Sequence, residues 1–255
     1  MHLIMEPFIR IYIVLIGLVI GSFLNVLIYR IPLKQSVVKG SSNCPRCSHR
    51  LNWLDLFPLL SYLFLRGKCR YCKSPISPRY PAVEAANAVC YYLIYINNGL
   101  QLSSLLYAVV CSSLIVLGLI DYDHKIIPNR FHIIVGVCAL LLALISRELT
   151  WIERLLGMFS ISVPLFVIAL FTGGIGEGDV KLFAVCGFLL GWKLILLTML
   201  LSSFFAAVYG ITLMVIKRAK GKTEIPFGPF IAFAVLVCMF AGDRLINIYL
   251  SLISK

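Results

Sequence analysis

Four cysteines in one polar stretch form two closely spaced pairs. The first pair is Cys44-Pro-Arg-Cys47, and the second, after 21 intervening residues, is Cys69-Arg-Tyr-Cys72. Each C-x2-C pair places two thiolates on one tight turn, and two such turns can close a tetrahedral site of four sulfur ligands. Zinc ribbons use this arrangement with a spacer of similar length. The spacing predicts structural zinc at these four cysteines, while another soft metal, redox thiols or two disulfides stay open as alternatives.

Two groups of acidic residues stand at the ends of long apolar stretches. One contains Asp121 and Asp123, and the other is Gly176-Glu177-Gly178-Asp179. Ionisable side chains in such places are costly unless they are paired, so they indicate a functional site. Gly176 and Gly178 free the backbone of an active-site loop and let another segment approach closely. The alternative for Asp179 is an ordinary helix N-cap.

Two carboxyl groups held close together can hydrolyse a peptide bond. They cannot readily both ionise, so one stays protonated. The ionised group can take a proton from water while its partner protonates the substrate carbonyl. No H-E-x-x-H motif occurs, and no Ser-His-Asp arrangement is apparent. The residues alone do not decide whether Asp121 or Asp123 would be the partner of Asp179.

The composition indicates where these residues are held. Sixty per cent of the 255 residues are hydrophobic and only 13% are charged, which excludes a soluble globular domain and a disordered chain. We predict an all-α polytopic membrane protein with about eight transmembrane segments and a zinc-binding loop after the first. The predicted spans are residues 8–29, 84–99, 102–120, 131–146, 155–173, 180–191, 194–216 and 229–248, of which 180–191 crosses only partly as a helix.

The basic residues predict the orientation of these spans. With the N-terminus outside, the inside segments carry 17 Lys and Arg and the outside segments carry 6. Basic residues favour the cytoplasmic side, so the cysteine loop and the aspartates are expected there. The net charge of +12 is therefore interpreted as an orientation signal, and no nucleic-acid partner is expected.

The first span also carries a packing pattern. Gly17 and Gly21 stand four residues apart, a spacing at which small residues let two helices approach. Asn25 either forms a hydrogen bond across that helix contact or touches substrate. His49, two residues after Cys47, is interpreted as a solvated loop residue rather than a metal ligand.

Taken together, these motifs resemble the bacterial type IV prepilin peptidases, which are bifunctional leader peptidases and N-methyltransferases. The resemblance runs along nearly the whole chain. Its residues are Gly21-Ser22-Phe23-Leu24-Asn25-Val26, Tyr29-Arg30-Ile31-Pro32, the two cysteine pairs, Trp53, Asp55-Leu56-Phe57-Pro58, Ser61-Tyr62, Leu65-Arg66-Gly67-Lys68-Cys69, Ile76-Ser77-Pro78-Arg79-Tyr80-Pro81-Ala82-Val83-Glu84, residues 121–129 and Gly176-Glu177-Gly178-Asp179.

The resemblance implies an intramembrane aspartyl protease of the bacterial inner membrane with Asp121 and Asp179 as its catalytic pair. Its substrates would be prepilin or pseudopilin helices of type IV pilus or type II secretion systems. Cleavage would follow a glycine after a basic leader, on the cytoplasmic side. S-adenosylmethionine would then methylate the new N-terminus, but the resemblance assigns no residues to that cofactor.

Three domains follow from this assignment. They are the first span (1–29), the cytoplasmic four-cysteine loop (30–83) and the membrane peptidase domain (84–255). Three other functions remain open: a transporter or channel with acids at the membrane edge, a non-enzymatic assembly factor, and a peptidase without methyltransferase activity.

Overall fold

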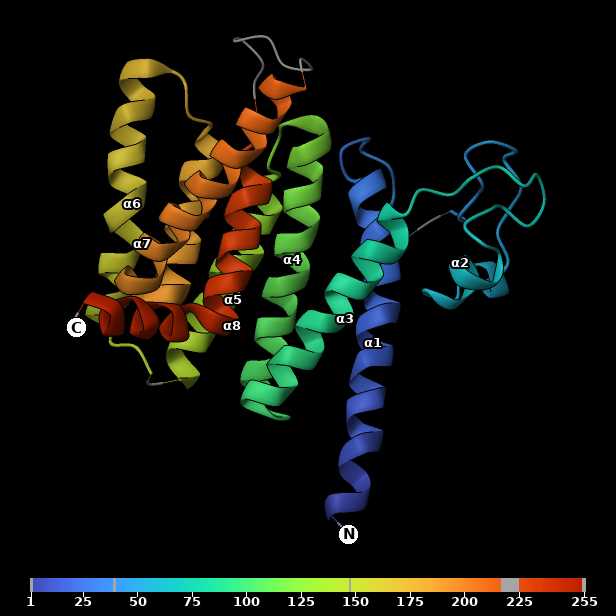
Figure 1. The fold of residues 1–255 in the computed structure, drawn as a ribbon, viewed down its shortest axis with the longest axis horizontal. Coiled ribbons are helices and arrows are strands. Elements are labelled where there is room, and N and C mark those ends of the chain that lie inside the picture. Colours follow the sequence, from blue (N-terminus) through green and yellow to red (C-terminus); the bar gives the residue numbers. More distant parts are fainter. Residues whose placement is uncertain (1, 39, 147, 217–224, 254–255) are drawn as a thin grey trace. The chain divides into compact units, whose positions relative to one another are not determined.

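The computed structural model describes residues 2–38, 40–146, 148–216 and 225–253 of the chain. Within these ranges the fold is helical, with two isolated β-bridges and no strand (Figure 1). The elements are α1 (His2–Arg30), the 3-10 helix η1 (Trp53–Asp55), α2 (Leu60–Phe64), α3 (Arg79–Asn98), α4 (Leu102–His124), α5 (Asn129–Ile145), α6 (Trp151–Thr172), α7 (Glu177–Val215) and α8 (Gly228–Ile253). The prediction of an all-α protein is confirmed.

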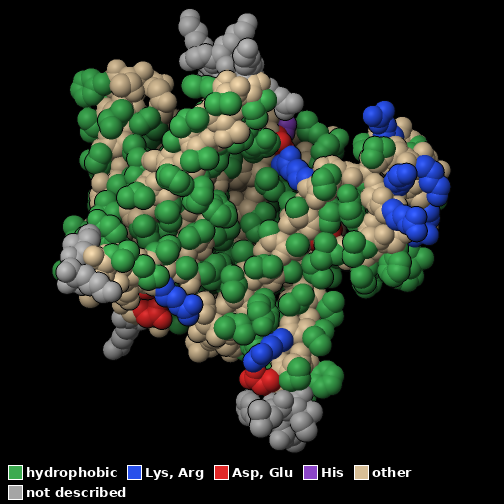
Figure 2. Space-filling model, in the orientation of Figure 1, with side chains coloured by type: hydrophobic (Ala, Val, Ile, Leu, Met, Phe, Trp, Pro, Cys, Tyr) green, Lys and Arg blue, Asp and Glu red, His purple; other side chains and the backbone are tan. Residues whose placement is uncertain are grey.

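The predicted spans coincide with these helices. Each lies within one helix or ends one residue beyond it. Among the described residues, five helices, α1, α4, α6, α7 and α8, are long and apolar enough to cross a membrane, and α5 is a shorter apolar helix. In Figure 2, hydrophobic side chains cover most of the visible helical surface. A water-exposed surface of this kind would be unfavourable, so the chain is a multi-pass membrane protein.

Two predicted spans share the single element α7. Its 39 residues are interrupted at Gly191, where φ is 76° and ψ is 173°. Only glycine adopts this region readily, so the helix breaks there. The break lies at the last residue of the predicted span 180–191. The two straight parts, 177–190 and 192–215, would measure about 21 Å and 36 Å at 1.5 Å per residue.

The chain divides into two compact units, residues 1–104 and 105–255. In the first unit, α1 packs along α3. A Cβ on Gly17 would lie 2.6 Å from Cα of Ala88, and one on Gly21 would lie 2.7 Å from Cα of Glu84. Both contacts therefore require glycine, which confirms the predicted packing pattern.

Asn25 forms a hydrogen bond within the same helix pair. Its side-chain amide donates to the carbonyl oxygen of Tyr80 at 3.1 Å. This is the first of the two roles considered for Asn25, and it links α1 to the first turn of α3.

The second unit contains most of α4 together with α5 to α8. Of the five span helices, α4 has by far the largest buried share, and its Leu114, Leu117 and Ile120 are fully enclosed. Helices α6 and α7 meet backbone to backbone at Gly157 and Gly187, where a Cβ on either glycine would collide with the carbonyl oxygen of the other. The core thus surrounds the helix that ends in the 121–124 acidic segment.

The two units group the chain differently from the expected domains 1–29, 30–83 and 84–255. Those domains are defined by position relative to the membrane rather than by packing, and they remain a prediction.

Candidate active site and metal centre

Asp121 lies in the last turn of α4 and is buried, with 6% of its surface exposed. Its Oδ2 atom accepts a hydrogen bond of 2.9 Å from the backbone N–H of Gly228. Gly228 is the first residue of α8, where backbone N–H groups lack helical partners and attract anions. Asp123, two residues later, is exposed. The structure therefore separates two aspartates that the sequence left equivalent.

Gly228 leaves no room for a side chain. A Cβ built there would lie 2.7 Å from Oδ2 of Asp121 and 3.1 Å from Cδ1 of Ile127. Gly178 meets the same isoleucine, because its Cβ would lie 3.1 Å from Cβ of Ile127. Ile127 therefore contacts both the start of α8 and the start of α7. In this way three segments far apart in the sequence come together around Asp121.

Asp179 lies on the glycine-rich side of this cluster. Gly176 occupies the N-cap of α7, so Asp179 is its third residue, and the N-cap alternative for Asp179 is wrong. The Oδ1 atom of Asp179 is buried and has no hydrogen-bond partner within the described part of the chain. Gly178, the residue before Asp179, and Gly228, which donates to Asp121, both meet Ile127. That Asp121 and Asp179 act as a pair remains a prediction.

A histidine contacts the first turn of α7 from a third helix. Nε2 of His132, on α5, lies 3.0 Å from the carbonyl oxygen of Gly178, and only 6% of the residue is exposed. Nearby, Glu177 and Lys181 form an exposed ion pair of 3.0 Å. The sequence did not indicate the roles of His132, Ile127 and Gly228, because each role is a contact between segments far apart in the chain.

The four cysteines of the loop form a second cluster, in the first unit. All four Sγ atoms lie within 4.8 Å of one another. Sγ of Cys44 and Sγ of Cys72, which belong to different pairs, are 3.9 Å apart. A tetrahedron with zinc–sulfur bonds of 2.3 Å has sulfur–sulfur distances of about 3.8 Å. The donor set and its spacing therefore fit a tetrahedral metal ion.

The two cysteine pairs adopt matching turns. In each, the N–H of the first cysteine donates to the residue five positions later: Cys44 to His49 and Cys69 to Ser74. The residue after each second cysteine, Ser48 or Lys73, has a positive φ of 56° or 58°. These turns direct both thiols of a pair inward. The ring of His49 stacks on Tyr71, 3.6 Å between centroids, and stands outside the metal-ligand cluster.

The protein environment shifts the pKa values of two of these thiols in opposite directions. Backbone N–H groups of Cys47 and Arg46 lower the pKa of Cys44 to about 6. The N–H of His49 acts in the same sense on Cys47, but burial and the Cys44 thiolate outweigh it and raise the pKa of Cys47 to about 11. A bound divalent cation would remove that repulsion and favour four thiolates.

Asp55 connects η1 to the second cysteine pair. It accepts a hydrogen bond of 2.6 Å from Nε of Arg70 and one of 3.2 Å from the hydroxyl of Tyr71. Burial alone would raise the pKa of Asp55, but Arg70 and the N–H of Asn52 outweigh it and hold that pKa below its usual range. The acid is therefore a structural partner of the loop.

Comparison with known proteins places this arrangement in a family. Residues 15–98 match the family described as "Bacterial Peptidase A24 N-terminal domain", and residues 108–211 match the "Type IV leader peptidase family". A prepilin leader peptidase/N-methyltransferase of Bacillus subtilis is 36% identical, with 92% of this chain and 96% of the relative aligned. The chain belongs to the type IV leader peptidase family.

Further relatives carry the same name. The prepilin leader peptidase/N-methyltransferase of Pseudomonas aeruginosa is 33% identical, with 93% of this chain and 92% of the relative aligned. That of Myxococcus xanthus is 34% identical over 86% of this chain and 67% of its own length. No solved structure matches the chain.

Proposed function

We propose that this protein is a prepilin leader peptidase that also N-methylates the new N-terminus. The observation that supports the peptidase activity is that Ile127 meets both Gly178, next to Asp179, and Gly228, which donates to Asp121. Membership of the family and the printed names of its relatives support both activities. The clients are prepilin or pseudopilin helices, which would lie among the spans with the scissile bond at the aspartates.

Asp121 and Asp179 are the proposed catalytic residues, with distinct roles. The Gly228 N–H favours the ionised form of Asp121, because a donor stabilises the carboxylate. Asp179, with a buried oxygen that lacks a donor, is suited to hold the shared proton. Asp121 would take a proton from water as the water attacks the scissile carbonyl, and Asp179 would give its proton to the carbonyl oxygen. Gly176 and Gly178, which lie at the N-cap and in the first turn of α7 rather than in the predicted loop, would stand beside the substrate backbone.

The four cysteines would hold zinc in a structural role. A closed site of four thiolates offers no open position for substrate. Zinc would stabilise a loop that lacks a large apolar core of its own, leaving the hydrolysis to the aspartates. Most basic residues flank the proposed inside ends, which supports an N-outside orientation with this loop and the aspartates at the cytoplasmic face of the inner membrane.

Methylation requires S-adenosylmethionine as the methyl donor. A pocket beside α2, described below, does not fit this cofactor. The cofactor has two cationic centres, whereas the residues that line the pocket include no acid, and Asp55, the one acid of residues 30–83, is already engaged by Arg70 and Tyr71. We therefore derive no methylation step from the described residues.

The test is a mass spectrum of a prepilin co-expressed with the wild-type protein, Asp121→Asn or Asp179→Asn. The wild type should remove the leader and add one methyl group, whereas either variant should leave the prepilin intact while still inserting into the membrane. Asp123→Asn, which changes an exposed acid two residues from Asp121, is the matched control and should cleave normally. Cleavage by Asp121→Asn or Asp179→Asn would refute the proposed pair, and cleavage without methylation would refute the second activity.

A further inference from the structure

The segment Trp53–Phe64 of the loop presents a cluster of apolar side chains to its surroundings. Phe64 is 82% exposed and Leu63 is 66% exposed, and the other exposed members are Trp53, Leu54, Leu56, Phe57 and Leu60. A patch of this kind is unfavourable in water and indicates a binding surface. Because α2 and η1 are both very short, the surface depends on the loop that the cysteine turns hold.

The anchoring of this segment places it beside the membrane-spanning part of α1. The N–H of Leu59, directly before α2, donates to Oε2 of Glu84 at 2.8 Å. Glu84 in turn packs against Gly21 of α1. Gly21 precedes Arg30, the last residue of α1, by nine positions, or roughly 13 Å along the helix. The start of α2 is therefore tied to a point well inside the candidate span Met5–Arg30.

The same loop carries a large excess of basic residues over acidic ones. Residues 30–83 contain ten Lys and Arg and one acid, Asp55. Figure 2 shows Lys and Arg side chains gathered over this loop next to hydrophobic ones. Basic residues beside apolar and aromatic side chains are typical of surfaces that enter the headgroup region of an anionic membrane.

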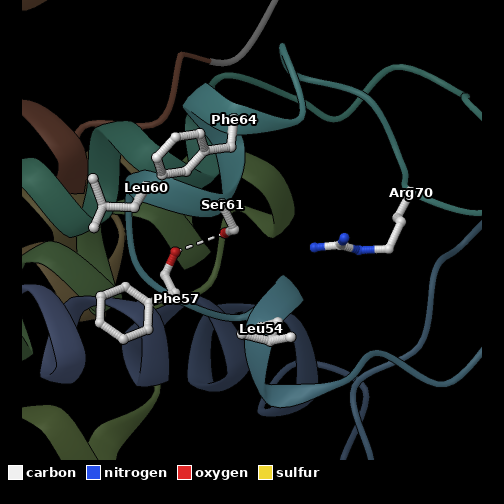
Figure 3. A pocket seen from close by; sticks show the side chains of 6 residues that line it. All are labelled: Leu54, Phe57, Leu60, Ser61, Phe64 and Arg70. Atoms are coloured by element: carbon white, nitrogen blue, oxygen red, sulfur yellow. Dashed lines mark hydrogen bonds between the residues drawn. The ribbon is translucent and has the colours of Figure 1, made fainter.

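A pocket of about 430 Å³ in this loop combines apolar side chains with a basic one. It is lined by Leu54, Phe57, Leu60, Ser61, Phe64 and Arg70. Figure 3 shows the guanidinium of Arg70 pointing across the pocket toward Ser61, opposite the apolar side chains. Nε of Arg70 donates to Asp55, which holds the guanidinium in place. An apolar wall facing a fixed cation suits a molecule with an acyl chain and an anionic head.

We propose that the Trp53–Phe64 segment docks into the bilayer leaflet beside the loop and that its pocket binds an anionic phospholipid. The phosphate would contact Arg70, and an acyl chain would pack against Leu54, Phe57 and Phe64. S-adenosylmethionine does not fit this pocket, because its net positive charge opposes that of the loop, and its binding there is the outcome that the test must exclude. The proposal requires the membrane spans and not the peptidase activity.

The experiment uses the full chain with Trp151→Phe and Trp192→Phe, which leaves Trp53 as the only tryptophan. The protein is placed in nanodiscs of phosphatidylcholine, with or without phosphatidylglycerol, whose acyl chains carry bromine near the headgroup. Bromine should quench Trp53 fluorescence, more strongly with phosphatidylglycerol. Phe64→Glu should reduce the quenching about twofold, because it places a charge in the apolar surface.

Val38→Glu is the matched control, since Val38 is equally exposed in the same loop but lies outside the pocket. It should leave the quenching unchanged, and equal metal content in both variants would show that the cysteine turns are intact. The proposal would be overturned if Phe64→Glu left the quenching of Trp53 unchanged. It would also be overturned if the quenching were the same with and without phosphatidylglycerol. So would loss of radiolabelled S-adenosylmethionine binding in Phe64→Glu with unchanged quenching. None of these readouts involves cleavage, so their failure would leave the proposed function untouched.

Discussion

At the scale of single residues, local spacing predicts part of the chemistry, and the rest depends on contacts between distant segments. The four cysteines were predictable because each pair lies on one turn and two turns make one tetrahedron. Asp179 drew notice because of the glycines around it, and its catalytic role is a proposal that the family resemblance supports. Gly228 was not, because it lies 107 positions after Asp121 and its role is to have no side chain. A single sequence contains no signal for that requirement.

This contact gives a prediction for Gly228→Ala. The added methyl group would lie 2.7 Å from Oδ2 of Asp121, so the carboxylate must move and the amide hydrogen bond must lengthen. Because displacements of about 1 Å can cost about 100-fold in rate, we expect prepilin cleavage to fall by about that factor. Initial cleavage rates in detergent would measure the effect.

Gly174→Ala is the control for this substitution. Gly174 lies two residues before the N-cap of α7. A Cβ on Gly174 would lie 3.6 Å from Oγ1 of Thr172, which is an ordinary contact distance. It should retain activity. A Gly228→Ala enzyme as fast as Gly174→Ala would show that the amide contact does not position Asp121.

At the scale of elements, hydropathy predicted where the helices are but not how each one ends. The span predicted at 84–99 begins at Arg79 in the structure, because a polar first turn is invisible to a hydropathy argument. The break at Gly191 was predictable, since a glycine beside a tryptophan and a lysine interrupts an apolar run. The sequence did not predict which helices pack against each other. An apolar face indicates that a helix is buried, but it does not indicate which helix covers that face.

The contact between α6 and α7 gives a prediction for Gly157→Ala. A Cβ at this position would collide with backbone atoms of Gly187 and Gly191, which cannot move aside as a side chain would. Overpacking of this kind costs about 1–3 kcal/mol. We expect a lower thermal unfolding temperature in detergent, with Gly136→Ala as a control because its Cβ would only meet Val185 at 3.6 Å. Equal unfolding temperatures for the two variants would contradict the tight contact.

At the scale of the whole molecule, the two compact units agree with the two family matches. Residues 15–98 fall within the first unit and residues 108–211 within the second. The four cysteines belong to the first unit and both aspartates to the second. Composition alone could not reveal this division. Both units contain long apolar helices, so no change in apolar content marks the boundary between them.

Metal removal should therefore affect the units differently. After treatment with a chelator, trypsin should cut the loop at Arg46, Arg50 or Arg66 faster than in the metal-loaded protein, because the two cysteine turns lose their common centre. A fragment carrying α4 to α8 should survive. Cys44→Ser with Cys47→Ser should show the same pattern without chelator, and Cys90→Ser, in α3, should not. Cleavage of the loop at equal rates with and without metal would refute a structural metal.

The break at Gly191 also affects how the protein enters the bilayer. The part of α7 before it, residues 177–190, is about 21 Å long, whereas the hydrocarbon layer is about 30 Å thick. Lipid alone retains such a segment poorly, so we expect its packing on α6, where Gly187 meets Gly157, to help hold it in the bilayer. Asp179, the third residue of this segment, would then reach its final depth only once the two helices have paired. The proposed peptidase would therefore become active only after this tertiary contact has formed.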